Sequence, residues 1–170
     1  KSGGIVSVVD NLVYDSLSGE VTGMIYPKFS DEPQVEVPMS HEYVSANGIQ
    51  GETNGEGSYL IDGLSGNANV QSNLNGPWAD VYNQQQDRAE HSASVNVPGS
   101  HSWNWQTEDT SYEDEEENAF YHTNIIHDYI TKPELGVDEM NLQMTVNVNI
   151  PQSCNAYYSP NENSINFYYA

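Results

Sequence analysis

The sequence of 170 residues is poor in basic residues. Lysine and arginine together number 4 against 25 aspartates and glutamates, which gives a formal net charge of −21. This excess of negative charge repels phosphate backbones and anionic lipid headgroups, so we expect neither nucleic acids nor membrane surfaces as partners. Cations are the expected partners instead, whether calcium, basic peptides or the ions of a salty medium.

Cysteines and long apolar runs are also scarce. Cys154 is the single cysteine, so no disulfide can form within the chain, and we expect this side chain to be structural rather than nucleophilic. The sequence contains no apolar run of transmembrane length and no signal peptide. Its acidity, its many Asn, Gln, Ser and Gly residues and a first residue other than Met are typical of a processed, secreted protein. We therefore predict an extracellular location.

Alternation of apolar and polar residues dominates the first hundred positions. Such runs occupy residues 5–9, 20–27, 34–39, 58–64, 67–74, 78–83 and 93–98. Between them lie turn-forming clusters such as Asn47-Gly48, Asn54-Gly55 and Asn75-Gly76. Short alternating strands at this spacing predict a mainly β protein, with a small antiparallel β-sandwich over residues 1–98.

An acidic segment follows the predicted sandwich. It carries seven acids between Glu108 and Glu117. A run of like charge is usually solvated, so we predict a linker over residues 99–117. The alternative is a calcium loop, because clustered carboxylates are the ligands that this ion selects. The spacing does not match an EF-hand, however, so the sequence defines no calcium ligands.

The periodicity changes to that of a helix from Asn118, and Pro133 ends it. We predict an α+β lobe over residues 118–170, made of this helix and a β-hairpin. Successive helical residues are rotated by about 100°, which places the apolar side chains on one face. That face, which we expect to pack, consists of Tyr121, His122, Ile125, Ile126, Tyr129 and Ile130.

Polar residues on the helix are candidates for a site. His122 and His127 are five positions apart, whereas a helical zinc pair needs a spacing of three or four, so we predict no metal site from them. His122 is expected to be a core histidine. Asn124, His127 and Asp128 share the other face, and we predict that they form a structural hydrogen-bonded cluster, with a supporting role behind a functional site as the alternative. No catalytic residue is predicted.

The first half of the chain resembles a known accessory module. GEVTGMIYP and the later TNGEGSYLIDGLSG are similar to the strand and hairpin of the transthyretin-like, carboxypeptidase regulatory-type β-sandwich. The matching residues of the hairpin are Thr53, Gly57, Tyr59, Ile61, Gly63 and Leu64. This resemblance implies a role in folding or attachment rather than in chemistry.

The second half resembles the start of the peptidase domain in fungalysin and thermolysin-like zinc metallopeptidases. The match covers NAFYHTNIIHDYI, the following LGVDE, and MTVNVNIPQSCNAYYSPNENSINFYY. Its matching residues are Phe120, Tyr121, Asn124, His127, Asp128, Gly136, Val137, Asp138 and Glu139. The resemblance implies that Asn155, Ala156 and Tyr157 lie on an edge strand that binds a peptide substrate by strand addition.

The chain lacks the chemistry of that family. It contains no His-Glu-x-x-His motif, so it has no ligands for the zinc ion that the family uses as cofactor. We therefore expect a non-catalytic N-terminal part of a secreted metalloendopeptidase-like protein, inactive by itself and partnered by the remainder of that protein. The alternative is an extracellular structural or adhesive subunit that self-associates into dimers or filaments by strand addition, with calcium as a possible ligand.

Overall fold

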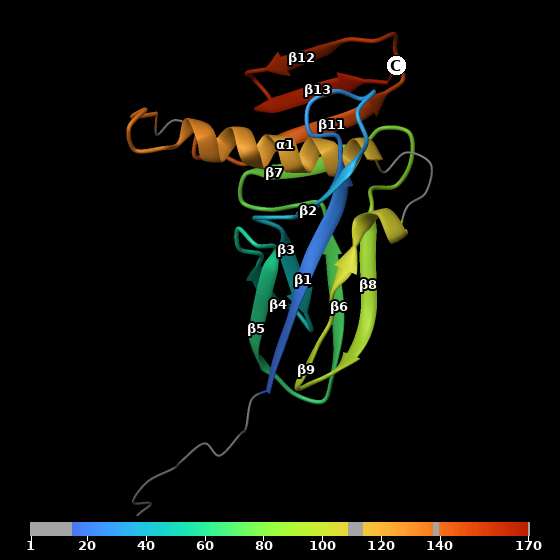
Figure 1. The fold of residues 1–170 in the computed structure, drawn as a ribbon, viewed down its shortest axis with the longest axis vertical. Helices are drawn as coiled ribbons and strands as arrows, with labels where there is room; N and C mark the ends of the chain where they lie inside the picture. Colours follow the sequence, from blue (N-terminus) through green and yellow to red (C-terminus); the bar gives the residue numbers. More distant parts are fainter. Residues whose placement is uncertain (1–14, 109–113, 138–139, 170) are drawn as a thin grey trace, which may run out of the picture.

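The computed structural model describes residues 15–108, 114–137 and 140–169. Within these residues the protein is mainly β, with one α-helix, and consists of a β-sandwich followed by a small lobe that contains the helix (Figure 1). This confirms the predicted fold class. The strand predicted at residues 5–9 lies outside the described residues.

The first sheet of the sandwich is organised around the long strand β1 (Asp15–Ile25). Strands β2 (Val35–Pro38) and β5 (Ser58–Leu64) pair with it in antiparallel fashion, and β9 (Gly99–Ser100) and β10 (Trp103–Asn104) in parallel. Leu17, Val21 and Ile25 of β1 are buried. Because they occupy odd-numbered positions of one strand, they point to the same face, which is the core.

The second sheet has the order β4-β3-β6-β8 and is antiparallel throughout. Its strands are β3 (Tyr43–Ala46), β4 (Ile49–Glu52), β6 (Asn67–Asn73) and β8 (Glu90–Asn96). The β3–β4 hairpin turns at Asn47 and Gly48, whose φ angles of 50° and 82° suit a tight hairpin turn. The turn was predicted, but its two strands were not, because they are only four residues long and β4 is largely exposed.

A third sheet makes up most of the lobe, in the order β12-β13-β11-β7. Strands β7 (Ala79–Asn83), β11 (Met144–Ile150) and β13 (Ser164–Tyr168) run parallel, and β12 (Ala156–Ser159) is antiparallel at the edge. We expected residues 78–83 to form a strand of the sandwich. They form β7 instead, which pairs along its length with β11. The proposed domain division at residues 98 and 117 stays a prediction.

Helix α1 (Asp114–Ile130) runs across the third sheet at the end of the sandwich (Figure 1). It packs against β1 on the sandwich side and against β7 and β11 on the other. The carboxylates of its first turn, Asp114 to Glu117, favour the positive end of the helix dipole, so the helix begins four residues before the predicted start. Among the described residues, no helix has the length and apolar character needed to cross a membrane.

Part of the acidic segment is buried, contrary to the predicted solvated linker. Glu116 and Glu117 are fully buried within α1, and Trp105, in the 3-10 helix η1 (Trp105–Glu108), is buried in the core. The carboxylates were expected to stay in water because burial of a charge is costly without hydrogen-bond partners. The backbone N–H groups of Met24 and Ala89 and the side-chain amide of Asn83 supply those partners here. Residues 109–113 of the acidic segment lie outside the described part of the chain.

The buried face of α1 is also the opposite of the predicted one. Ile125, Ile126 and Tyr129 are exposed, whereas Phe120 and Asn124 are buried. The reversal follows from the position of Glu116 and Glu117. Since these carboxylates bond to the sandwich and the neighbouring loop, the residues one turn further along, around Phe120, face inward as well.

Candidate functional site

The third sheet, β12-β13-β11-β7, is called the C-terminal sheet from here on. One of its faces is apolar and becomes more exposed from β11 to β12. Val146 and Val148 of β11 are 0% and 1% exposed and lie on the side of α1. The register places Ile165 of β13 beside Val146, and Tyr158 of β12 opposite Ile165. Neighbouring residues in register share a face. Ile165 is half-buried and Tyr158 is 52% exposed, so α1 covers only part of this face.

A groove of 380 Å³ runs between α1 and the uncovered part of this face. Its lining is mainly apolar and includes Ala119, His122, Thr123 and Ile126 of the helix and Val148, Ile165, Phe167 and Tyr168 of the sheet. A smaller hollow shares Thr123, Ile126 and Ile165 and adds Leu142 and Met144. Large apolar side chains along such a surface are typical of an interaction site.

The other face of the same sheet carries a row of polar side chains, which is buried at β13. Asn147 Nδ2 donates to Asn166 Oδ1 at 2.8 Å, and Asn166 Nδ2 donates to Ser164 Oγ at 2.9 Å. Gln84 Nε2 continues the row by donating to Asn147 Oδ1 at 2.9 Å. Ser164 and Asn166 are buried, while Ile165 and Phe167 between and beside them are not. Strand β13 thus buries its polar side chains and leaves its apolar ones partly exposed, which reverses the usual distribution, whereas Val146 and Val148 of β11 are buried.

Strand β12 forms the exposed edge of the sheet. Ala156 and Tyr157 lie in this strand, Asn155 precedes it, and all three are exposed. Tyr168 N–H donates to the Asn155 carbonyl at 3.0 Å. In an antiparallel ladder, hydrogen-bonded pairs alternate with outward-facing residues, so the backbone groups of Ala156 and Tyr158 point to the free edge. The role of Asn155, Ala156 and Tyr157 in binding a peptide stays a prediction.

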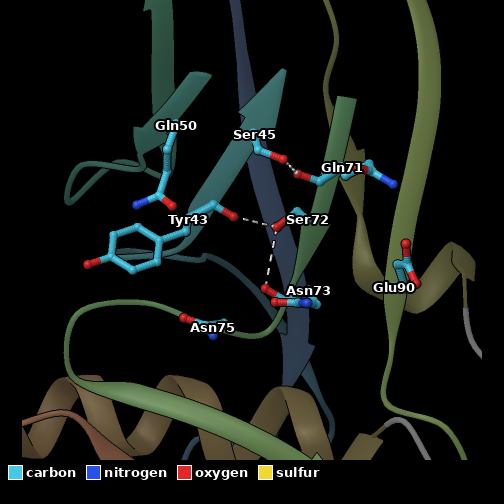
Figure 2. A pocket seen from close by; sticks show the side chains of 8 residues that line it. All are labelled: Tyr43, Ser45, Gln50, Gln71, Ser72, Asn73, Asn75 and Glu90. Atoms are coloured by element: carbon cyan, nitrogen blue, oxygen red, sulfur yellow. Dashed lines mark hydrogen bonds between the residues drawn. The ribbon is translucent and has the colours of Figure 1, made fainter. Parts of the chain in front are cut away.

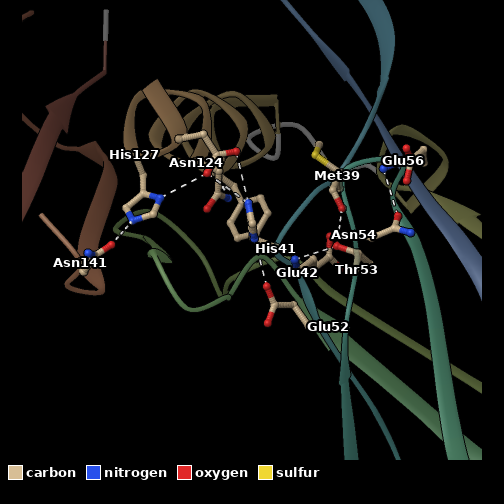
Figure 3. Close-up of polar contacts among 12 residues, drawn as sticks. Met39, His41, Glu42, Glu52, Thr53, Asn54, Glu56, Asn124, His127 and Asn141 are labelled. Carbon is tan, nitrogen blue, oxygen red and sulfur yellow. Dashed lines mark hydrogen bonds and ion pairs between the residues drawn. The ribbon is translucent and has the colours of Figure 1, made fainter. Parts of the chain in front are cut away.

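The predicted polar cluster on α1 is partly assembled. Asp128 Oδ1 lies 3.3 Å from His127 Nδ1, and His127 Nε2 lies 3.2 Å from Asn141 Oδ1 (Figure 3). Asn124 does not join them, because its Nδ2 donates to the Phe120 carbonyl one turn earlier at 3.0 Å. The structural role of the cluster stays a prediction.

The sandwich contributes a residue that we did not anticipate in this cluster. His41 Nε2 lies 3.2 Å from Asp128 Oδ1, and His41 Nδ1 lies 3.0 Å from Glu52 Oε1. The His127 ring stacks on Trp78, with centroids 3.9 Å apart. His41 has a left-handed φ of 64°, which is unusual for a residue other than Gly. These contacts hold the C-terminal half of α1 to the sandwich.

Two buried glutamates attach the N-terminal half of α1. Glu117 Oε2 accepts the backbone N–H of Met24 at 2.8 Å, at the end of β1. Glu116 Oε2 accepts the backbone N–H of Ala89 at 2.9 Å. Buried backbone donors need partners, and an ionisable carboxylate is a strong one. The glutamates therefore fix α1 to the top of the sandwich, a role that their place in an acidic run concealed.

A third buried carboxyl, that of Glu42, was not singled out from the sequence. Burial raises its pKa to about 8, hydrogen bonds from Ser72 and Trp105 oppose this, and the nearby Glu117 adds to it. Ser72 Oγ lies 2.5 Å from Glu42 Oε1 and 2.8 Å from the Tyr43 carbonyl. A serine has one hydroxyl proton, so it cannot donate to both. A neutral Glu42 carboxyl supplies the second proton.

The sandwich carries a polar hollow of 290 Å³ on its second sheet (Figure 2). It is lined by Tyr43, Ser45, Gln50, Gln71, Ser72, Asn73, Asn75 and Glu90. Ser45 Oγ donates to the Gln71 carbonyl at 3.3 Å, and the Ser72 hydroxyl faces the Tyr43 carbonyl. The hollow thus presents hydroxyl and amide groups, in contrast to the apolar groove in the lobe.

The histidines of α1 are separated, as their spacing predicts. His122 is half-buried, and its Nε2 lies 2.9 Å from the Tyr26 carbonyl, while His127 contacts Asn141. Cys154 is exposed. Over residues 15–108, 114–137 and 140–169, no three His, Cys, Asp or Glu side chains converge as a metal site would require.

Comparisons with known proteins identify no family for this chain. No family model matches it, and no curated protein matches it. Among solved structures, a DUF3823 family protein from Parabacteroides merdae aligns with 17% identity and a TM-score of 0.30. The alignment covers 54% of this chain and 44% of that one, so this chain spans less than half of the length of the protein it matches. A likeness this weak carries no argument about function.

These findings overturn the resemblance to fungalysin and thermolysin-like metallopeptidases preceded by a transthyretin-like sandwich. Nothing in the comparisons points to a metallopeptidase, and the aligned structure belongs to a DUF3823 family. The physical reason is that several matching residues have local or packing roles: Gly57, Gly63 and Gly136 have positive φ angles, and Tyr59, Ile61, Leu64 and Phe120 are core residues. Such residues are selected by local backbone and packing needs, which recur in unrelated folds.

Proposed function

We propose that this chain is a structural module that self-associates by strand addition at β12. The observation that supports this proposal is the free edge of that strand, where the backbone groups of Ala156 and Tyr158 face outward. Unpaired backbone groups at a sheet edge are a template for a further strand. An extracellular setting, predicted from composition, would make the module a structural or adhesive subunit.

Charge favours a second copy as the occupant of the edge. Residues 144–169 contain a single charged side chain, Glu162, in a chain whose net charge is −21. This segment is therefore the part of the surface where two copies can meet with little repulsion. Natural edge strands are commonly protected by lysine or proline, and β12 contains neither.

Pairing of β12 with β12 of another copy would be antiparallel and two-fold symmetric. Each strand then presents the same residues to the other, so the interface closes as a dimer. The two four-stranded sheets would join into one continuous sheet, with Tyr158 of each copy near the shared edge.

The test is sedimentation velocity over a wide range of protein concentration. The unmodified chain is expected to pass from monomer to dimer. Ala156→Pro removes an outward N–H at the first residue of β12, where proline is tolerated, and is expected to keep the chain monomeric. Tyr158→Lys is expected to act similarly, by placing two like charges across the interface.

The matched control is Leu60→Lys, on an exposed position of β5. It changes the net charge by the same amount and also replaces a large exposed side chain. Since it lowers the overall repulsion, it should leave dimer formation intact or strengthen it. A folded chain that stays monomeric at every concentration, or a dimer that tolerates Ala156→Pro, would disprove the proposal.

A further inference from the structure

Helix α1 covers about half of the width of the C-terminal sheet. Strands lie about 4.8 Å apart, and a helix with its side chains is about 10 Å across, so one helix covers roughly two strands. In this protein α1 packs against β7 and β11, and β13 and β12 lie beyond it (Figure 1). The face of β13 and β12 is therefore not covered by α1, and it is about as wide as one more helix.

The side chains in this space are those of an incomplete apolar layer. Ile126 of α1 is 55% exposed and forms one wall of the groove, and Phe167 of β13 is 39% exposed. Ile165, which the register places beside the buried Val146, also lines the groove. A helix placed beside α1 at the usual spacing of about 8–10 Å would cover these residues with apolar side chains at positions i, i+3, i+4 and i+7.

The charges around the groove indicate the chemistry of its occupant. Glu115 lines the groove, and Asp114 lies beside Glu115 in an adjoining hollow. Lys132 lies over the Tyr129 ring, with its Nζ 5.1 Å from the centroid. An occupant with basic residues at its margins would complement these carboxylates.

We propose that the groove binds an amphipathic α-helix of a partner protein, with apolar residues toward Ile126, Ile165 and Phe167 and basic residues toward Glu115. This site differs from the edge of β12, since it uses the side chains of a sheet face rather than free backbone groups. A second copy is not the expected occupant, because α1, the α-helix of the described residues, carries five acids between Asp114 and Asp128.

Three synthetic peptides test the proposal by fluorescence anisotropy at physiological ionic strength. The first is a helical peptide with leucines at i, i+3, i+4 and i+7 and lysines elsewhere. The second has the same composition in scrambled order, and the third has glutamate in place of lysine. Tighter binding of the first peptide than of both others supports the proposal. Equal binding of the scrambled peptide would show plain charge attraction and would overturn it.

Protein variants locate the binding site. Ile126→Ser and Phe167→Ser each remove groove contacts without changing the charge and are expected to weaken binding of the first peptide by about tenfold. Leu60→Ser is the matched control on the sandwich and should bind normally. Unchanged binding by both groove variants, with thermal melts that show them folded, would overturn the proposal.

The edge variant separates this site from self-association. Ala156→Pro should bind the first peptide as the unmodified chain does, even though it is expected to be monomeric. If Ile126→Ser abolishes dimer formation instead, and the peptide does not bind, the groove is an interface between copies and the partner-helix proposal fails. A failure of self-association alone leaves the peptide result as the deciding measurement for the groove.

Discussion

Glu117 and Met24 are 93 positions apart in the chain, and the Glu117 carboxylate accepts the backbone N–H of Met24 at 2.8 Å. This contact joins the first turns of α1 to the end of β1. It explains why the acidic first turns of α1 are buried at Glu117, whereas the isoleucines further along the helix are exposed. The same helix forms one wall of the groove, so the glutamate also positions the groove.

Removal of this contact should destabilise the fold. Glu117→Ala leaves the Met24 N–H without its acceptor, which is expected to cost about 1–3 kcal/mol in the free energy of unfolding. Glu115→Ala is the matched control, because it removes the same charge from an exposed position of the same turn. Urea unfolding of both variants measures the difference. Equal midpoints for the two would contradict the assigned role.

Glu42 should make the stability depend on pH. Its pKa rises from an ordinary 4.5 to about 8 in the folded protein, mainly through burial. The folded state therefore holds a proton that the unfolded state releases between these values. The stabilisation is complete below pH 4.5 and is lost as the pH rises toward 8, by at most about 1.4 kcal/mol for each pKa unit.

Glu42→Gln tests this expectation with little change of shape. An amide can donate to Ser72 Oγ and accept from Trp105 Nε1, as the neutral carboxyl does. At pH 5 we expect a free energy of unfolding near that of the unmodified chain. At pH 9 we expect it to be higher than that of the unmodified chain by up to a few kcal/mol. Parallel pH profiles for the two proteins would refute the raised pKa.

The β3–β4 turn should depend on the glycine at position 48. Its φ of 82° is strained for other residues, and no atom lies within 4 Å of an added Cβ, so Gly48→Ala tests the backbone alone. We expect a loss of about 1 kcal/mol. Gly55→Ala, also in open space, has no positive φ and should change the stability little. The comparison is a pair of thermal melts, and similar losses for both variants would count against the turn geometry.

Salt should raise both stability and self-association. The net charge of −21 opposes folding and the approach of a second copy, and added ions screen that repulsion. The melting temperature and the dimer fraction are both expected to increase in concentrated sodium chloride. Parallel melts in calcium and in chelator show whether a divalent ion does more than screen. A melting temperature that is the same in all these media would disprove the prediction.

Most of the sandwich could be predicted from the sequence because its signals are local. The strand at residues 58–64 was predicted with the bounds observed for β5, and the turn at Asn47-Gly48 was placed correctly. Alternation and turn chemistry act between near neighbours, so a single sequence contains them. The extreme net charge is likewise a property of composition alone.

Only the tertiary structure decided which side of α1 is buried and what lies beside it. The isoleucine-rich face was the apolar one by sequence, yet Glu116 and Glu117 turned the helix the other way by bonding to Met24 and Ala89. Likewise, the alternation in residues 79–83 suits a strand of the sandwich as well as a strand of the C-terminal sheet. Their pairing with β11 depends on residues more than sixty positions away. Such choices rest on distant backbone donors and strand partners, which local patterns do not encode.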